Sequence, residues 1–103
     1  MQLQMIVHGG VIFTLADSAM GMTLLSVLSP GTRVGTIEAK TNFLLPVRSG
    51  ELVAEASIVH LGRSIAVLEA TVYNIVEGDQ RAVARMLGTF SISESKGTVV
   101  AEK

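Results

Sequence analysis

The longest stretch of the chain without a turn signal runs from Val11 to Leu28, where Gly21 is the one glycine and proline is absent. Its length favours a helix of about four to five turns over a strand. Almost every face of such a helix is apolar, and a helix of that kind is normally surrounded by protein. The polar and small residues around its middle fall on one narrow stripe by spacings of three and four; they are Thr14, Asp17, Ser18 and Gly21.

After Pro30 the polar and apolar positions alternate with a period of two, which is typical of a half-exposed strand. Thr36, Glu38, Lys40 and Asn42 alternate there with Ile37, Ala39, Thr41 and Phe43. Three further segments rich in Val, Ile, Ala and Thr follow, at about 52–61, 65–76 and 82–93. Turn signals separate these segments at 29–31, 46–50, 61–63 and 78–79.

The connections between these segments are short, which favours antiparallel neighbours, because a parallel crossover needs about a dozen residues or more. The economical arrangement is an α+β domain in which one long buried helix is wrapped by a curved antiparallel sheet. We expect a single domain over residues 1–94, followed by a polar, frayed tail at 95–103.

Composition indicates that this domain is apolar for its size. Hydrophobic residues make up 49% of the 103 residues and charged residues 17%, and the mean hydropathy is +0.51. A chain of this length buries about 65% of its surface on folding, so its core is thin. We therefore expect a homo-oligomer.

Several classes of function are excluded or disfavoured by composition. The net charge of −1 gives no broad basic surface for nucleic acid. The absence of cysteine removes disulfides, thiolate metal sites and a cysteine nucleophile. Two histidines, His8 and His60, make a multi-histidine metal site improbable within one chain. No apolar run is long enough to span a membrane, and no secretory signal starts the chain, which fits a cytoplasmic protein.

Asp17 is the first candidate for chemistry, because an unpaired carboxylate is costly on so apolar a helix. His8-Gly9-Gly10 is the second, since glycines directly before a helix let a ligand approach the unsatisfied N–H groups of its first turn. Those donors suit an anion or a developing oxyanion. Gly9 and Asp17 lie roughly 12 Å apart along one helix, so one chain cannot bring both to one carbonyl. Two chains with antiparallel helices about a two-fold axis could do so.

These residues carry a resemblance to a known family. The run from Val7 to Gly21, VHGGVIFTLADSAMG, resembles the signature of the hotdog-fold acyl-CoA thioesterases, with the phenylacetic-acid-degradation (PaaI-type) family as the closest branch. The string H-G-G-x-x-x-x-L-x-D is followed, as in that family, by a turn and about four long segments. The resemblance extends to about Ser93 and implies a hotdog fold, hydrolysis of an acyl-CoA to a free acid and coenzyme A, and a homodimer. A dimer of dimers, which would be a homotetramer, stays open beside the dimer.

The resemblance also implies roles for particular residues. Asp17 matches the catalytic carboxylate, which acts as nucleophile or as general base. Gly9 matches the glycine whose N–H polarises the thioester carbonyl, and His8 shapes that loop. Gln2 falls where relatives carry Asn or Gln near the leaving sulfur, and Thr36 falls where some carry a Ser that orients the water or the carboxylate. In the family, the equivalents of Asp17 and Gly9 come from different subunits.

Coenzyme A would enter as part of the substrate, and no separate cofactor is expected. Basic side chains are expected to bind its phosphates. Arg63, which follows Gly62, matches Gly-Arg pairs that lie near the nucleotide in the family, and Gly10 is expected to contact coenzyme A as well. The other candidate cations are better explained as solvated surface groups; they are Arg33, Arg48, Arg81 and Arg85. His60 is expected to be a structural residue of its strand. The five methionines, Met20 and Met22 among them, are expected in the core, and the alternative is that some of them line an acyl pocket.

One departure concerns the N-terminus, because members of the family usually have a helix and a strand before the position of Gln2. The chain starts at Met1, which predicts a truncated or reduced N-terminus. Aryl and medium-chain acyl groups both stay open as substrates. Three alternatives remain. The first is a hotdog dehydratase or hydratase, but these enzymes need a histidine paired with an acid, and His8 does not match that pattern. The others are a non-catalytic acyl-CoA-binding or sensor module and a purely structural oligomer.

Overall fold

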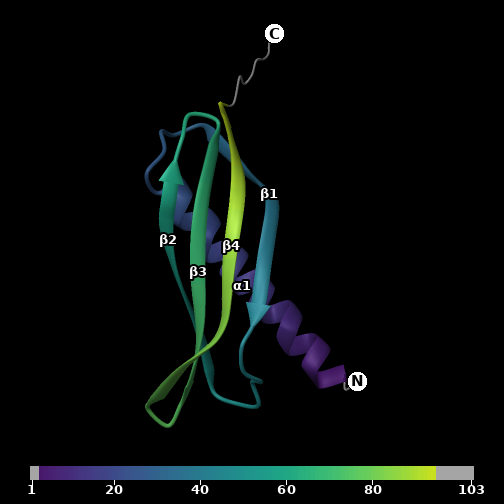
Figure 1. The fold of residues 1–103 in the computed structure, drawn as a ribbon. Coiled ribbons are helices and arrows are strands. Elements are labelled where there is room, and N and C mark those ends of the chain that lie inside the picture. The colour runs from purple at the N-terminus through teal and green to yellow at the C-terminus, as the bar shows by residue number, and fades with distance from the viewer. Residues whose placement is uncertain (1–2, 95–103) are drawn as a thin grey trace.

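A computed structural model describes residues 3–94 of the chain, and it consists of one long helix packed on one face of a four-stranded sheet (Figure 1). All strand pairs are antiparallel, and the strand order is β1-β4-β3-β2. The α+β prediction is therefore confirmed. The elements are α1 (Leu3–Leu25), β1 (Thr32–Phe43), β2 (Glu51–Leu61), β3 (Ile65–Val76) and β4 (Asp79–Glu94). The predicted tail at 95–103 lies outside the described residues.

The core forms between the inner face of the sheet and one side of α1. The helix contributes residues spaced by four, which stack along one side: Ile12, Ala16, Met20 and Leu24. The central strands β3 and β4 contribute the rest of the buried set, eight of its twelve residues. Gly88 on β4 makes room for this packing, because a Cβ there would lie 3.0 Å from Met20 Cε.

Both edge strands contain a register shift at the same level of the sheet. In β1 the shift falls between Thr36 and Glu38, and in β2 it falls between Ile58 and His60. Glu38 and His60 lie on one cross-strand row, because Glu38 pairs with Thr89, Thr89 with Val67, and Val67 with His60. Bulges bend a strand and increase its twist. Two bulges at one level account for the curvature of the sheet around α1.

The connection from β1 to β2 differs from the prediction that short connections join neighbours. β1 and β2 lie at opposite edges of the sheet, so the segment 44–50 crosses the ends of β4 and β3. Its first half is bound to β4, where the Leu44 N–H donates to the Val83 carbonyl at 2.8 Å. Its second half is bound to β3, because Asn74 Nδ2 donates to the carbonyls of Ser49 and Glu51 at 2.9 and 3.0 Å.

Gly50 and Asn74 make the second crossing possible. Gly50 has a φ of 92°, and a Cβ there would collide with the carbonyl oxygen of Ile75. Only glycine adopts this conformation at low cost. Asn74 is the one buried polar residue in the described part of the chain, and its two bonds hold the connection against β3.

The start of the helix was predicted wrongly. Helix α1 begins at Leu3, not after Gly10, and it ends at Leu25, not at Leu28. Two glycines cost only about 1 kcal/mol each inside a helix, which is too little to stop one that continues into an apolar segment on either side. Within the described residues, no helix combines the length and hydropathy that crossing a bilayer requires.

The expectation that protein surrounds α1 is not met within one chain. Val11, Phe13 and Leu25 are between 41% and 48% exposed, and Met22 is 71% exposed. The prediction that the methionines belong to the core holds for Met20 and Met86 and is wrong for Met22. A single sheet covers one side of a helix, so a helix that is apolar all round keeps an exposed apolar side.

Candidate functional site

Asp17 and Thr36 face each other across the contact between α1 and the edge strand β1. Thr36 Oγ1 donates a hydrogen bond of 2.9 Å to Asp17 Oδ1. Asp17 is half-buried and Thr36 is exposed, so the pair stands at the border between core and solvent. The structure therefore brings together two of the residues that the sequence singled out. A hydroxyl bound to one carboxylate oxygen fixes the orientation of the acid while the group stays accessible.

The bulge in β1 is what turns Thr36 toward Asp17. Strict alternation would place Thr36 on the same face as Glu38, and this part of the prediction is wrong. Thr36 pairs with Phe90, and Ala39 pairs with Gly88, which both lie on the buried face of β4. The extra residue between them is Ile37, which is 57% exposed. One inserted residue reverses the side to which the preceding residue points.

Gly9 lies at the far end of the same contact between α1 and β1. A Cβ at Gly9 would lie 3.9 Å from Phe43 Cζ, whereas Asp17 contacts Thr36 near the other end of the strand. The two helix positions are roughly 12 Å apart at 1.5 Å per residue. Within one chain the two groups therefore cannot meet at one carbonyl, as the spacing predicted.

The glycine pair does not form a free helix N-terminus in this chain. Gly9 and Gly10 lie inside α1, where the N–H of each residue is normally bonded to the carbonyl four residues earlier. The expectation of open N–H donors at this point is therefore wrong for the chain as it folds here. Gly10 has open space around it, since a Cβ there would meet nothing within 4 Å. His8 belongs to the same helix, and Gln2 lies outside the described residues.

Arg63 lies in the hairpin between β2 and β3, at the end of the sheet where β1 begins. Gly62 closes this turn, with its N–H donating to the Ile65 carbonyl at 2.9 Å. The hairpin is also bound to β4, because the Ile92 N–H donates to the Ser64 carbonyl at 2.8 Å. Ile92 lies two residues from Phe90, the partner of Thr36. Arg63 therefore belongs to the same end of the molecule as the Asp17–Thr36 pair.

The remaining candidates lie elsewhere. His60 lies within β2, as expected, but it is exposed near the end of the strand instead of being packed inside it. The candidate cations outside the hairpin are all exposed, as expected for solvated groups; they are Arg33, Arg48, Arg81 and Arg85. Among the described residues no three histidines, aspartates or glutamates gather as metal ligands do.

Two residues near the site were not singled out as functional by the sequence. Phe43 reaches Gly9, as described above. Thr41 lies on the inner face of β1, and its Oγ1 is buried without a hydrogen-bond partner. Strand periodicity already placed both residues opposite the polar positions. The approach of Phe43 to Gly9 depends in addition on the diagonal path of the helix across the sheet (Figure 1).

Comparison with known proteins gives a consistent picture. Residues 4–79 match the model of the thioesterase superfamily. A thioesterase family protein from Silicibacter pomeroyi is 36% identical to this chain, with a TM-score of 0.79. The match covers 84% of this chain and 63% of the Silicibacter pomeroyi chain. A Bacillus halodurans protein crystallised with coenzyme A is 35% identical, with a TM-score of 0.78. That match covers 84% of this chain and 58% of the Bacillus halodurans chain. A protein of Halobacterium salinarum with a provisional esterase name is 34% identical over 91 residues.

The chain spans about 60% of the length of this last relative, and 84% of the chain takes part in the match. The helix on a curved four-stranded antiparallel sheet is the hotdog fold of the thioesterase structures. The match to the superfamily model includes Asp17, Gly9 and Thr36, and it covers most of the chain. The chain therefore belongs to the thioesterase superfamily.

Proposed function

We propose that this protein hydrolyses an acyl-CoA thioester to a free acid and coenzyme A, as a PaaI-type member of the superfamily. The observation that supports this most directly is the half-buried Asp17 carboxylate, held by the Thr36 hydroxyl at 2.9 Å. An acid that is oriented but still accessible can act on a substrate beside the helix. Family membership supports thioester hydrolysis in general, whereas the acyl-CoA substrate and the roles below are our proposal.

Asp17 can act by either of two routes. As general base, it takes a proton from water while the water oxygen attacks the thioester carbonyl carbon; the C–S bond then breaks and the leaving thiolate takes up a proton. As nucleophile, its carboxylate attacks the same carbon, expels the thiolate and forms a mixed anhydride, which water opens to regenerate the acid. In both routes the products are one carboxylic acid and one thiol.

Gly9 of a second subunit is proposed to supply the N–H that stabilises the oxyanion. A donor of this kind contributes about 2.7–4 kcal/mol to the transition state. Because Gly9 lies inside α1, the helix must open ahead of Gly9 to release that N–H. The two adjacent glycines, Gly9 and Gly10, weaken the helix at this position, because each glycine destabilises a helix by about 1 kcal/mol relative to alanine. His8 and Gln2 are proposed to shape the loop and to lie near the leaving sulfur.

Coenzyme A is proposed to bind beside the hairpin of Gly62 and Arg63, with Gly10 allowing close approach of the chain that carries the thioester. A guanidinium is suited to phosphate through paired N–H donors. The Bacillus halodurans protein was crystallised with coenzyme A, which supports this class of ligand. No other cofactor is proposed, and the proposed location is the cytoplasm.

The proposal is tested by thiol release from a panel of aryl- and medium-chain acyl-CoA esters. We expect turnover by the wild type and a loss of 100-fold or more in kcat for Asp17→Asn, because general-base catalysis contributes about 10²–10⁴-fold. Asp79→Asn is the matched control, since Asp79 is an exposed carboxylate at the first position of β4. Equal turnover by wild type and Asp17→Asn would refute the role of Asp17. Binding of acyl-CoA without turnover by the wild type would identify a binding module instead.

A further inference from the structure

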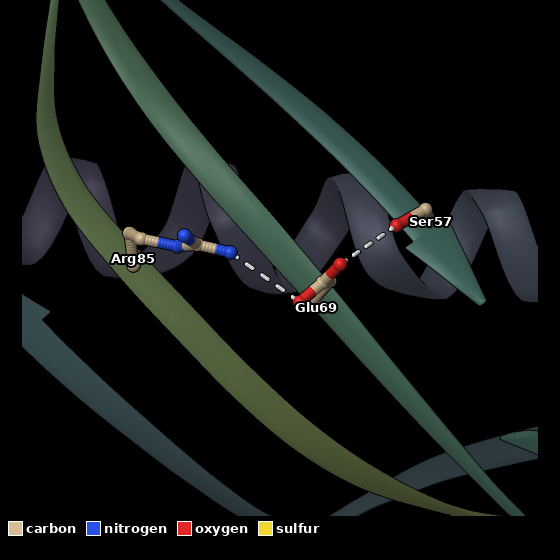
Figure 2. A network of polar contacts seen from close by, with 3 residues as sticks. All are labelled: Ser57, Glu69 and Arg85. Carbon is tan, nitrogen blue, oxygen red and sulfur yellow. Dashed lines mark hydrogen bonds and ion pairs between the residues drawn. The ribbon is translucent and has the colours of Figure 1, made fainter. Parts of the chain in front are cut away.

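Thr41 carries a buried hydroxyl that has no hydrogen-bond partner. Its Oγ1 is screened from solvent, although Thr41 as a whole is half-buried. Polar groups on the opposite face of the sheet are better matched, because Ser57 Oγ donates to Glu69 Oε2 at 3.4 Å and Arg85 Nη2 lies 3.4 Å from Glu69 Oε1 (Figure 2). A buried hydroxyl without a partner is unfavourable. Packing in this structure therefore does not explain a hydroxyl at position 41.

Thr41 lies between the two contacts that β1 makes with α1 at the candidate site. At one contact Thr36 donates to Asp17, and at the other Phe43 Cζ approaches Gly9. The β4 partners of Thr36, Thr41 and Phe43 are, in that order, Phe90, Met86 and Ala84. Thr41 is therefore four of six residues along the way from the first contact to the second.

The same fraction of α1 identifies the helix turn beside Thr41. Asp17 and Gly9 are eight residues apart, and two thirds of that separation, counted from Asp17, leads to about residue 12. Ile12 is 3% exposed, so this turn packs against the sheet. Thr41 therefore lies beside the turn that directly follows Gly9 and Gly10.

Opening of α1 ahead of Gly9 frees backbone donors in this turn. In an α-helix each N–H donates to the carbonyl four residues earlier. When residues 3–8 leave the helix, the N–H groups of residues 9–12 therefore lose their acceptors. A threonine hydroxyl accepts such N–H groups at the starts of helices. The Thr41 hydroxyl can accept one of them in this open form, whereas none is free in the closed form, where α1 is helical from Leu3.

We propose that Thr41 is a positioning residue that favours the open form of α1, in which the Gly9 N–H is free for the thioester carbonyl. This inference rests on the proposed function, which requires that opening. In the closed form the Thr41 hydroxyl is buried without a partner, and in the open form it accepts a hydrogen bond from the new first turn of the helix. Threonine at this position therefore raises the fraction of the protein in which Gly9 can bind the oxyanion.

The test compares the wild type with Thr41→Val, which removes the hydroxyl and keeps a branched side chain, in two measurements that need no substrate. Hydrogen exchange resolved by NMR should be about 3- to 30-fold slower at the amides of Gly9 and Gly10, because loss of a capping bond makes opening rarer by about that factor. Urea unfolding should give an equal or higher midpoint, since the closed form loses no hydrogen bond. Thr41→Ser keeps the hydroxyl and should exchange like the wild type.

Thr71→Val is the matched control, since Thr71 lies within β3 on the face away from α1, opposite Arg85, and it should leave exchange at Gly9 and Gly10 unchanged. A lower midpoint in Thr41→Val would mean that the hydroxyl already has a partner in the closed form. Unchanged exchange at the two glycines, or slowing shared equally by the amides of β3 and β4, would mean that Thr41 has no local effect on opening. Each of these results would overturn the proposal.

Thiol release then connects the opening to the reaction. The value of kcat/KM for Thr41→Val should fall by the same factor as the exchange rate, because a smaller fraction of the protein is competent. An unchanged kcat/KM beside slower exchange would overturn the part of Thr41 in the reaction. If the wild type hydrolyses no acyl-CoA, the proposed function fails, and the exchange at Gly9 and Gly10 still decides whether Thr41 favours the open form.

Discussion

Thr36 and Asp17 are 19 residues apart, and a single hydrogen bond of 2.9 Å joins them. The bond depends on one further residue, Ile37, because the bulge at this position turns Thr36 to the helix side of the sheet. A hydroxyl that donates to a carboxylate restricts its rotation. In the proposed mechanism Thr36 is a positioning residue that acts through Asp17.

Removing the Thr36 hydroxyl should therefore slow the chemical step more than it weakens substrate binding. We expect Thr36→Val to lower kcat by roughly 10- to 100-fold with little change in KM, because a hydrogen bond to a charged group contributes about 1.5–3 kcal/mol. Thr36→Ser keeps the hydroxyl and should retain most of the activity. Steady-state kinetics on the best substrate of the panel measures both constants. An unchanged kcat in Thr36→Val would show that the bond has no part in catalysis.

At the residue scale the sequence identified the acid and its partner but not the geometry that joins them. Asp17 stood out because a carboxylate is costly on an apolar helix, and Thr36 was chosen by resemblance. Alternation alone placed Thr36 on the face opposite Asp17, since a bulge leaves no mark in a pattern of period two.

At the scale of elements, the connection between β1 and β2 determines the strand order. It crosses two strand ends and is held by Asn74, whose amide binds the carbonyls of Ser49 and Glu51. The rule that short connections join neighbouring antiparallel strands predicted the pairs β2–β3 and β3–β4. It did not predict that β1 lies beside β4. That pairing is non-local and depends on how the sheet closes around α1, which segment-by-segment patterns do not contain.

Asn74→Ala should lower the free energy of unfolding by about 1–3 kcal/mol, because the two hydrogen bonds from the buried Asn74 amide to the carbonyls of Ser49 and Glu51 are lost. Urea unfolding followed by circular dichroism at one fixed protein concentration measures this change. Gln80→Ala is the control, since Gln80 is an exposed amide at the start of β4 and its loss should change the value by about 0.5 kcal/mol or less. Equal midpoints for the two variants would contradict the role of Asn74 in holding the connection.

At the scale of the whole molecule, the single chain leaves apolar surface exposed on both sides. Helix α1 leaves Val11, Phe13 and Met22 exposed, and Leu87 is exposed on the face of the sheet that points away from α1. Composition predicted an oligomer because the chain is apolar for its length, and these surfaces are where subunits can meet. The predicted helix start after Gly10 failed, so the release of the Gly9 N–H and its presentation to a second subunit have to be tested directly.

Complementation between inactive variants tests the shared site most directly. Asp17→Asn removes the acid, and Gly9→Val keeps its N–H but places a branched side chain where the substrate carbonyl would approach it. Each variant is therefore expected to lose activity, because each disables one half of both sites in a dimer. When equal amounts are unfolded together and refolded, half of the dimers should be hybrids, and one of the two sites in each hybrid combines an intact Asp17 with an intact Gly9. Thiol release should then recover to about a quarter of the wild-type rate. A mixture no more active than its parents, or full activity in Gly9→Val alone, would contradict a site built from two subunits.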